Sequence, residues 1–204
     1  MVSEDNFLMK GLVLVTGIPG VGKTAVLNEF EKIAKKSKVN ASIINYGSIM
    51  NSILEDKGKD LNRDEIRKQK MDSQKKIQLK AADIIAKKGR KNIIIVDTHM
   101  AINTKAGFLP GLPYDVLRKL NPRLLILIET APKDILKRRG LDNSRDRDTQ
   151  SIQEIELGLE WSRYLASACS TLVGIPVKIL KNEQGKQKEA ANDLFNSIIE
   201  QLSD

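Results

Sequence analysis

The sequence predicts an α/β fold in which a five-stranded parallel sheet is flanked by helices. Three observations predict it: five short apolar runs, longer helical patterns between those runs, and a glycine-rich motif that joins the first run to a helix. The chain has 204 residues, of which 41% are hydrophobic, so it can bury one substantial core. We therefore expect a single domain.

The five apolar runs are rich in Ile, Val and Leu, and most of them are continuous rather than alternating. Strands with this pattern are buried on both faces, as in a parallel sheet that helices cover on each side. Helical patterns between successive runs indicate βαβ units. The expected strands are Leu12–Val15, Ser42–Asn45, Asn92–Val96, Leu124–Ile128 and Val177–Leu180.

Three long helices are expected besides the one that follows the glycine-rich motif. Asn62 followed by Glu65 predicts a capping box at the start of a helix that ends at Gly89. Apolar residues at 3.6-residue spacing predict a second helix from about Thr149 to Leu172. A final helix is expected over residues 188–202.

Two polar stretches interrupt this alternation of strands and helices. They are Asn51–Gln74, between the second and third strands, and Lys137–Thr149, after the fourth. We interpret both as mobile segments over a substrate cleft. The alternative is ordinary surface loop and helix.

The net charge of +8 indicates an anionic partner, which could be a nucleic acid, a membrane surface or a phosphate ester. Solvated lysines on helix faces are the alternative explanation. The basic residues are spread along the chain, and aromatic residues make up only 4%, so platforms for base stacking are scarce. We therefore expect no nucleic-acid partner.

The single cysteine, Cys169, lies among small and apolar residues, which predicts packing rather than catalysis. One cysteine excludes an internal disulfide framework and a Cys-based zinc cluster, and it suits a reducing cytosol. Residues 1–6 are mixed in charge, and Leu12–Val15 is too short for a signal core or a membrane span. We expect a cytoplasmic protein with no membrane partner.

The glycine-rich motif matches the phosphate-loop pattern G-x-x-x-x-G-K-[ST] in full, and it lies between an expected strand and an expected helix. Backbone N–H groups of such a loop converge on phosphate oxygens, and the helix N-terminus adds positive potential. Lys23 is expected to reach the β- and γ-phosphates, and the Thr24 hydroxyl to bind Mg²⁺. The expected ATP-binding residues are Gly17, Ile18, Pro19, Gly20, Val21, Gly22, Lys23, Thr24 and Ala25.

A second magnesium candidate, Asp97, follows the expected strand Asn92–Val96. Ligands of open parallel sheets bind at the carboxyl ends of the strands. Asp97 is therefore placed to hold Mg²⁺, directly or through water. The alternative is a polar strand end without a ligand.

A phosphate loop binds phosphate without selecting a reaction, so three classes of protein are possible. A GTPase switch is disfavoured because the chain has no N-K-x-D motif and because Asp97 is followed by Thr98-His99-Met100 rather than completing D-x-x-G. A motor ATPase usually carries an acidic residue beside the strand-end Asp, where this chain has Thr98. A small-molecule kinase remains the favoured class.

Arginines in both polar stretches favour a kinase, because guanidinium groups grip phosphate in a bidentate manner. Phosphoryl transfer depends mainly on positioning and charge neutralisation. An acceptor that is itself a phosphate is already anionic and needs no general base. The arginines are Arg63 and Arg67 in the first stretch and Arg138, Arg139, Arg145 and Arg147 around the second.

In these motifs the chain resembles the archaeal adenylate kinases, from the first strand to about Asn182. The pattern G-[FY]-L-P-G-L-P is the most particular, because it separates this family from the bacterial and eukaryotic adenylate kinases. The matching segments are residues 17–24, 45–47, 63–68, 97–99, 107–113 and 143–148.

This resemblance implies the reaction ATP + AMP ⇌ 2 ADP with Mg²⁺, carried out by a P-loop nucleotide kinase. It implies a core of residues 10–46, 90–136 and 149–204, an AMP-binding segment at about 47–75 and a short lid at about 137–148. The lid is too short for the zinc-binding version of some bacterial relatives. Family members are commonly trimeric, so a homotrimer is expected.

The resemblance also implies roles for individual residues. Lys23, Arg138, Arg145 and Arg147 are the catalytic candidates, with Arg138 against the ATP base or phosphates and the other two arginines closing on the transferred group. The AMP-binding candidates are Tyr46, Arg63, Arg67 and His99. His99 is a candidate because it lies just after Asp97 at the expected cleft, and a structural hydrogen bond is the alternative role for it. The chain departs from the family pattern at Asn103, where a basic residue is expected, and at Ser48, where an acidic one is expected; Lys105 is a candidate to compensate for the first.

Two alternatives to an adenylate kinase stay open from the residues alone. One is a related kinase with another acceptor base, such as CMP or UMP. The other, less favoured, is a nucleic-acid-binding ATPase.

Overall fold

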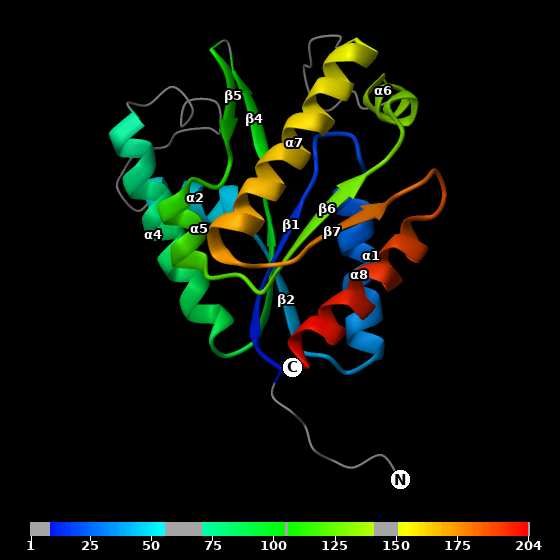
Figure 1. Ribbon diagram of the computed structural model, residues 1–204. Helices are drawn as coiled ribbons and strands as arrows, with labels where there is room; N and C mark the ends of the chain where they lie inside the picture. Colours follow the sequence, from blue (N-terminus) through cyan, green and yellow to red (C-terminus); the bar gives the residue numbers. More distant parts are fainter. Residues whose placement is uncertain (1–8, 56–70, 105, 141–150, 204) are drawn as a thin grey trace.

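The computed structural model describes residues 9–55, 71–104, 106–140 and 151–203. It contains a five-stranded sheet in the order β2-β3-β1-β6-β7, in which all neighbouring strands run parallel (Figure 1). The predicted fold class is therefore confirmed, and each predicted strand is found to within a residue at either end. The strands are β1 (Gly11–Thr16), β2 (Ala41–Asn45), β3 (Ile93–Asp97), β6 (Leu124–Glu129) and β7 (Val177–Lys181).

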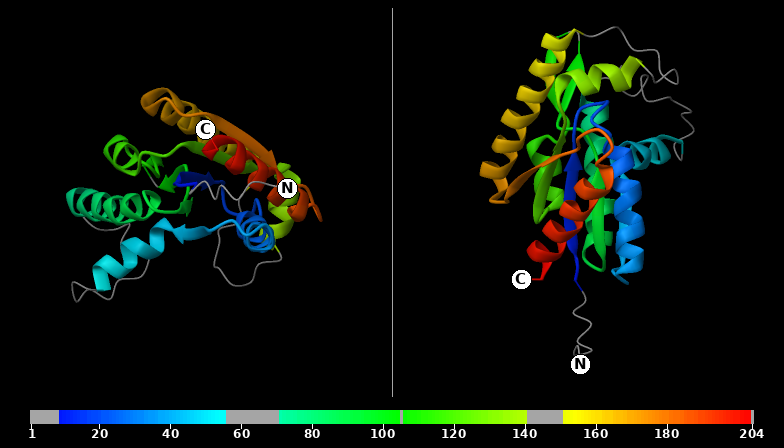
Figure 2. Two further views of the ribbon diagram at one scale, coloured as in Figure 1. Left: turned by 90° about the horizontal axis from the view of Figure 1, so that it is seen from below. Right: turned by 90° about the vertical axis from the view of Figure 1, so that its right-hand side faces the viewer.

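Helices cover both faces of the sheet. One face packs against α1 (Lys23–Lys36) and α8 (Gln187–Leu202), and the other mainly against α4 (Met71–Gly89), α5 (Tyr114–Leu120) and much of α7 (Ile152–Val173). Seen from below, α1 and α8 lie together on one side of β1, and α4 and α5 lie on the other (Figure 2, left). Among the described helices, none is long and apolar enough to cross a membrane.

The central strand shows why the apolar runs are continuous. Leu12 and Leu14 of β1 join the cluster under α4 and α5, whereas Val13 and Val15 join the cluster under α1 and α8. Each of these side chains is at most 2% exposed. A strand buried on both faces needs apolar residues at every position, which is the pattern in the sequence.

The helix predictions are confirmed where the chain is described, with small shifts at the ends. Ser151 caps α7, and Ser151 and Glu154 form a capping box, so this helix starts at Ile152; Thr149, where its start was predicted, lies outside the described residues. The capping box expected at Asn62 and Glu65 also lies outside them. Cys169 is buried in α7 as predicted, and burial raises the pKa of its thiol.

The two polar stretches were predicted to be mobile segments, but their described parts include helix, as in the alternative interpretation. Residues 51–55 belong to α2 (Tyr46–Glu55), and residues 137–140 belong to α6 (Pro132–Gly140). Both helices are held by buried apolar side chains, Ile53 and Leu54 in α2 and Ile135 in α6. The helices that contain residues 51–55 and 137–140 are therefore packed against the core.

A small antiparallel hairpin, β4 (Ala101–Thr104) and β5 (Gly107–Pro110), was not predicted. Its second strand begins the segment Gly107–Pro113, which carries the most particular part of the family resemblance. The Gly111 N–H donates to the Met100 carbonyl (2.8 Å), and a Cβ on Gly111 would lie 1.9 Å from the His99 carbonyl oxygen. Only glycine allows this close approach of the hairpin to the end of β3.

Candidate active site

The phosphate loop connects the end of β1 to the start of α1, as predicted. Gly22 is the N-cap residue of α1, no side chain caps the helix among the described residues, and its first turn has no acidic residue. The N–H groups of Lys23, Thr24 and Ala25 have no acceptor within the helix. This end of α1 is therefore suited to bind an anion.

Two glycines of the loop are required by its geometry. A Cβ on Gly17 would lie 2.8 Å from the Ile128 carbonyl oxygen in β6. Gly22 has a φ of 84°, and a Cβ there would lie 2.4 Å from Asn182 Nδ2. These contacts explain why the motif has glycine at its first and sixth positions.

Lys23 and Asp97 lie together at the carboxyl edge of the sheet. The Lys23 ammonium pairs with Asp97 and donates to the Thr98 carbonyl (2.9 Å), and Asn45 Nδ2 donates to the other Asp97 oxygen (2.8 Å). Asn45 and Asp97 are register partners at the ends of β2 and β3. Thr24 is exposed at the start of α1. Of the two predicted magnesium ligands, Asp97 therefore contacts the lysine that is expected to bind phosphate, and Thr24 follows that lysine in α1.

Arginines of α6 contact the phosphate loop directly. Arg138 donates to the Val21 carbonyl (2.9 Å), the Asn182 carbonyl (3.1 Å) and the Gln184 side chain (3.2 Å). Arg139 donates twice to the Pro19 carbonyl, at 2.9 Å and 2.6 Å. Arg138 is therefore placed beside the loop. The other two candidates of this group, Arg145 and Arg147, lie outside the described residues.

Two of the four AMP-binding candidates lie within the described residues. Tyr46 is 3% exposed, and its hydroxyl donates to the Gln78 carbonyl (2.7 Å), so it has a packing role in α2; burial raises the pKa of its phenol. His99 is half-buried just after β3. Arg63 and Arg67 lie outside the described residues.

Ser48 and Asn103, the two residues that depart from the family pattern, both lie in the described part of the chain. The Ser48 N–H and hydroxyl both donate to Asn45 Oδ1, at 3.0 Å and 3.3 Å, which satisfies an N–H group in the first turn of α2. Asn103 is exposed on β4. Lys105, the candidate to compensate for it, lies outside the described residues.

A buried ion cluster at the end of β6 was not predicted from the sequence. Glu129 is 1% exposed and accepts from Arg163 Nε and Nη2 (2.6 Å and 2.7 Å) and from Lys181 Nζ (2.8 Å). Burial alone raises the pKa of the Glu129 carboxyl, but these hydrogen bonds and charges outweigh burial and hold that pKa below its ordinary value. The available signal was a carboxylate directly after the apolar run Leu124–Ile128.

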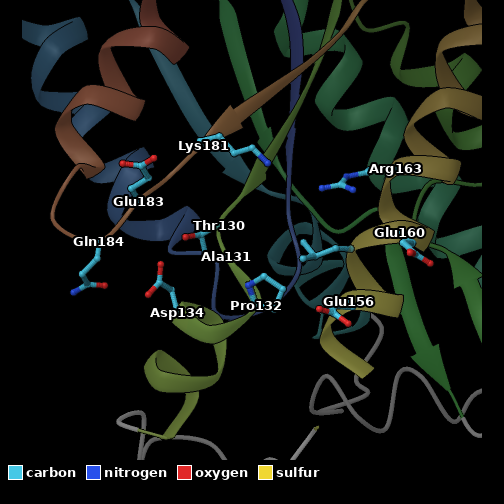
Figure 3. Close-up of a pocket in the computed structure, with 11 residues that line it drawn as sticks. Thr130, Ala131, Pro132, Asp134, Glu156, Glu160, Arg163, Lys181, Glu183 and Gln184 are labelled. Carbon is cyan, nitrogen blue, oxygen red and sulfur yellow. The ribbon is translucent and has the colours of Figure 1, made fainter. Parts of the chain in front are cut away.

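An open pocket of about 820 Å³ lies between α6, α7 and the end of β7 (Figure 3). Its cations are Arg163 and Lys181, and both already pair with Glu129. The carboxylates of the lining are Asp134, Glu156, Glu160 and Glu183. Because its cations are paired and its other charges are negative, this pocket is less suited to a triphosphate than the phosphate loop is.

Comparisons with known proteins agree with the motifs. A family model described as an AAA domain matches residues 16–156, which include the phosphate loop. An adenylate kinase from Sulfurisphaera tokodaii is 43% identical over 190 residues, which cover 91% of this chain and 98% of that protein. One from Methanothermobacter thermautotrophicus is 42% identical over 189 residues, with 93% and 99% covered. The chain belongs to the adenylate kinase family.

Solved structures support the fold of this adenylate kinase family member at low sequence identity. A shikimate kinase from Bacteroides thetaiotaomicron superposes with a TM-score of 0.57 at 12% identity, covering 92% of this chain and 98% of that one. A shikimate kinase from Acinetobacter baumannii gives 0.50 at 14% identity, with 95% and 96% covered. The parallel sheet flanked by helices is therefore a P-loop kinase fold.

Replacing Glu129 with glutamine is expected to destabilise the protein by about 2 kcal/mol at neutral pH, because hydrogen bonds to a charged group are lost. Glu129 has a lowered pKa in the folded protein, so its stabilisation is present above the ordinary carboxyl pKa of about 4.3 and is lost as the pH falls through the lowered value. Thermal unfolding from pH 7 to pH 3 should show the two proteins converging in acid. A difference that stays constant across this range would contradict the ion cluster.

Proposed function

We propose that the chain catalyses reversible transfer of the γ-phosphoryl group of ATP to AMP, which gives two ADP. The observation that carries the proposal is the identity with adenylate kinases over nearly the full length of both chains. The uncapped start of α1 and the adjacent Lys23 support the ATP half of the site. ATP, AMP and ADP are then the ligands.

The phosphate loop would provide most of the contacts to the phosphates of ATP. Its N–H groups, with those of the first turn of α1, would bind the β- and γ-phosphate oxygens. Lys23 would exchange its contact with Asp97 for these oxygens, since its ammonium lies beside the loop. Arg138 would neutralise charge on the ATP side of the site, because its guanidinium already lies on the loop backbone. Charge neutralisation of this kind favours the transition state.

Magnesium suits the oxygen donors at this edge of the sheet. The Thr24 hydroxyl and the Asp97 carboxylate would hold the ion, which prefers oxygen ligands and keeps several waters or phosphate oxygens. Among residues 9–55, 71–104, 106–140 and 151–203, no three His, Cys, Asp or Glu side chains gather as a metal cage. When bound, Mg²⁺ supplies positive charge to the phosphates.

The acceptor half of the site remains a proposal from the family resemblance. AMP would bind against the segment of about residues 47–75, with Arg63, Arg67 and His99 as the candidate contacts, and about residues 137–148 would form the lid. Arg145 and Arg147 would close on the transferred group. The attacking phosphate oxygen of AMP is already anionic, so the chain needs no general base.

The test follows the fate of a labelled γ-phosphate. With ATP labelled at this position, Mg²⁺ and AMP, the label should appear in ADP. Label released only as inorganic phosphate, at a rate that AMP does not change, would contradict phosphoryl transfer and indicate an ATPase.

We also propose that the protein is a cytoplasmic homotrimer. An exposed aromatic patch supports self-association: Phe108 of β5 stacks on Trp161 of α7 at 5.4 Å between ring centroids, and Tyr164 packs against Trp161 at 6.4 Å. Tyr164 is 64% exposed. Sedimentation equilibrium should give three times the chain mass of 22.8 kDa, and a mass of 22.8 kDa across micromolar concentrations would contradict a trimer.

A further inference from the structure

Asn182 joins three separate parts of the candidate active site. It directly follows β7, and its N–H donates to the Glu129 carbonyl (2.7 Å) at the end of β6. Its side-chain Nδ2 donates to the Val21 carbonyl (2.7 Å) in the phosphate loop, and its own carbonyl accepts from Arg138 (3.1 Å). Asn182 is 2% exposed, so these contacts are shielded from water.

The ion cluster around Glu129 fixes the backbone of Asn182. The preceding residue, Lys181, pairs with the buried Glu129 carboxylate (2.8 Å), and Glu129 also supplies the carbonyl that accepts from the Asn182 N–H. Side chain and main chain of Glu129 therefore both hold the end of β7. The position of the Asn182 backbone relative to the sheet is therefore fixed.

One polar atom of the Asn182 amide lacks a hydrogen-bond partner. Its Oδ1 is buried and has no hydrogen-bond partner among the described residues. Turning the amide over would place this oxygen against the Val21 carbonyl, where two acceptors would face each other. The turned amide would lose the hydrogen bond to Val21 and gain no described partner for Oδ1, so the contact with Val21 determines the orientation of the amide.

Holding the Val21 carbonyl determines where the Gly22 N–H points. The two groups belong to one planar trans peptide unit and point in opposite directions. Asn182 Nδ2 and Arg138 Nη1 both donate to the Val21 carbonyl, at 2.7 Å and 2.9 Å. The Gly22 N–H is thereby turned away from Asn182. Because Gly22 is a glycine at φ 84°, this peptide could turn over with little steric cost unless it were held.

We propose that Asn182 is a positioning residue for the phosphates of ATP. It holds the Val21–Gly22 peptide so that the Gly22 N–H faces the bound phosphates, and it fixes Arg138 beside the loop. Asn182 acts through these groups and does not itself touch the nucleotide. The inference rests on the proposed function for its ligand, ATP, but concerns binding rather than transfer to AMP.

The test replaces Asn182 with aspartate, which keeps the shape, removes the donor and sets a carboxylate against the Val21 carbonyl. We expect the affinity for Mg²⁺–ATP, measured by calorimetry, to fall at least tenfold, while the affinity for AMP stays within twofold. The Gly22 amide proton, observed by NMR, should shift less on ATP binding than in the unsubstituted protein. The matched control is Asn192→Asp, on the exposed face of α8, where Nδ2 donates to the Lys188 carbonyl (3.0 Å); it should change none of these values.

An affinity for ATP within twofold of the unsubstituted protein would overturn the inference, and so would equal losses for ATP and AMP, which would indicate general damage. If Asn182→Asp does not fold, Asn182→Ala carries the same criteria. Neither binding nor the Gly22 shift requires turnover. If the protein binds ATP but forms no ADP, the proposed function is contradicted, but the role of Asn182 in ATP binding can still be tested.

Discussion

Replacing Lys23 with alanine is expected to lower kcat by about 10²–10³-fold, the usual loss when one preorganised charge contact to the transition state is removed. Lys23 lies at the start of α1 with its ammonium between Asp97 and the Thr98 carbonyl, within the partly buried edge of the sheet. No other described lysine has this position. The fold should persist, because Asp97 still accepts from Asn45. Steady-state ADP formation and a circular dichroism melt measure the two quantities.

A second lysine of the same helix provides the control for this substitution. Lys32 is 70% exposed on α1 and pairs only with Glu29 (2.6 Å) among the described residues, so Lys32→Ala removes an equal charge from the surface. Its kcat should match that of the unsubstituted protein. If Lys23→Ala kept kcat within threefold, the phosphate loop could not be the site of phosphoryl transfer.

Replacing Asp97 with asparagine is expected to raise the Mg²⁺ concentration needed for half-maximal activity about 10–100-fold, the range seen when a group that supports a metal site is lost. The amide keeps the shape of the side chain but removes the negative charge. That charge now faces Lys23 and Asn45. Activity should recover in part at high Mg²⁺.

A magnesium titration of ADP formation measures this effect. The control is Asp193→Asn, which makes the same chemical change on the exposed face of α8. Only the Asp97 variant should shift the titration. If both variants need the same Mg²⁺ concentration for half-maximal activity, Asp97 contacts Lys23 and Asn45 at the sheet edge but does not bind the metal.

The features that could be predicted are those with a local signal. The buried strands have continuous apolar runs, and the phosphate loop is a contiguous motif whose glycines are explained by contacts at Gly17 and Gly22. The hairpin of β4 and β5 has no such signal, because its strands are short and half-exposed and its position depends on the contact of Gly111 with His99. That contact is visible only once the chain is folded.

The missed site residues have partners far away in the sequence. Glu129 pairs with Arg163, 34 residues along the chain, and Asn182 donates to Val21 across 161 residues. A polar residue directly after an apolar strand indicates a candidate site at the end of that strand, as it did for Asp97. Which side chain meets it depends on strand order and helix packing, so Glu129 and Asn182 could not be assigned a role from sequence.

The acceptor nucleotide is the central claim that a single assay tests most directly. ADP formation should be measured with Mg²⁺–ATP and, in turn, AMP, GMP, CMP and UMP. Strong activity with AMP and little with the others is the predicted result, because adenylate kinases are similar over nearly the whole chain. Greater activity with CMP or UMP would contradict the AMP assignment while keeping the phosphate-loop chemistry. Absence of activity with every acceptor would contradict the kinase assignment itself.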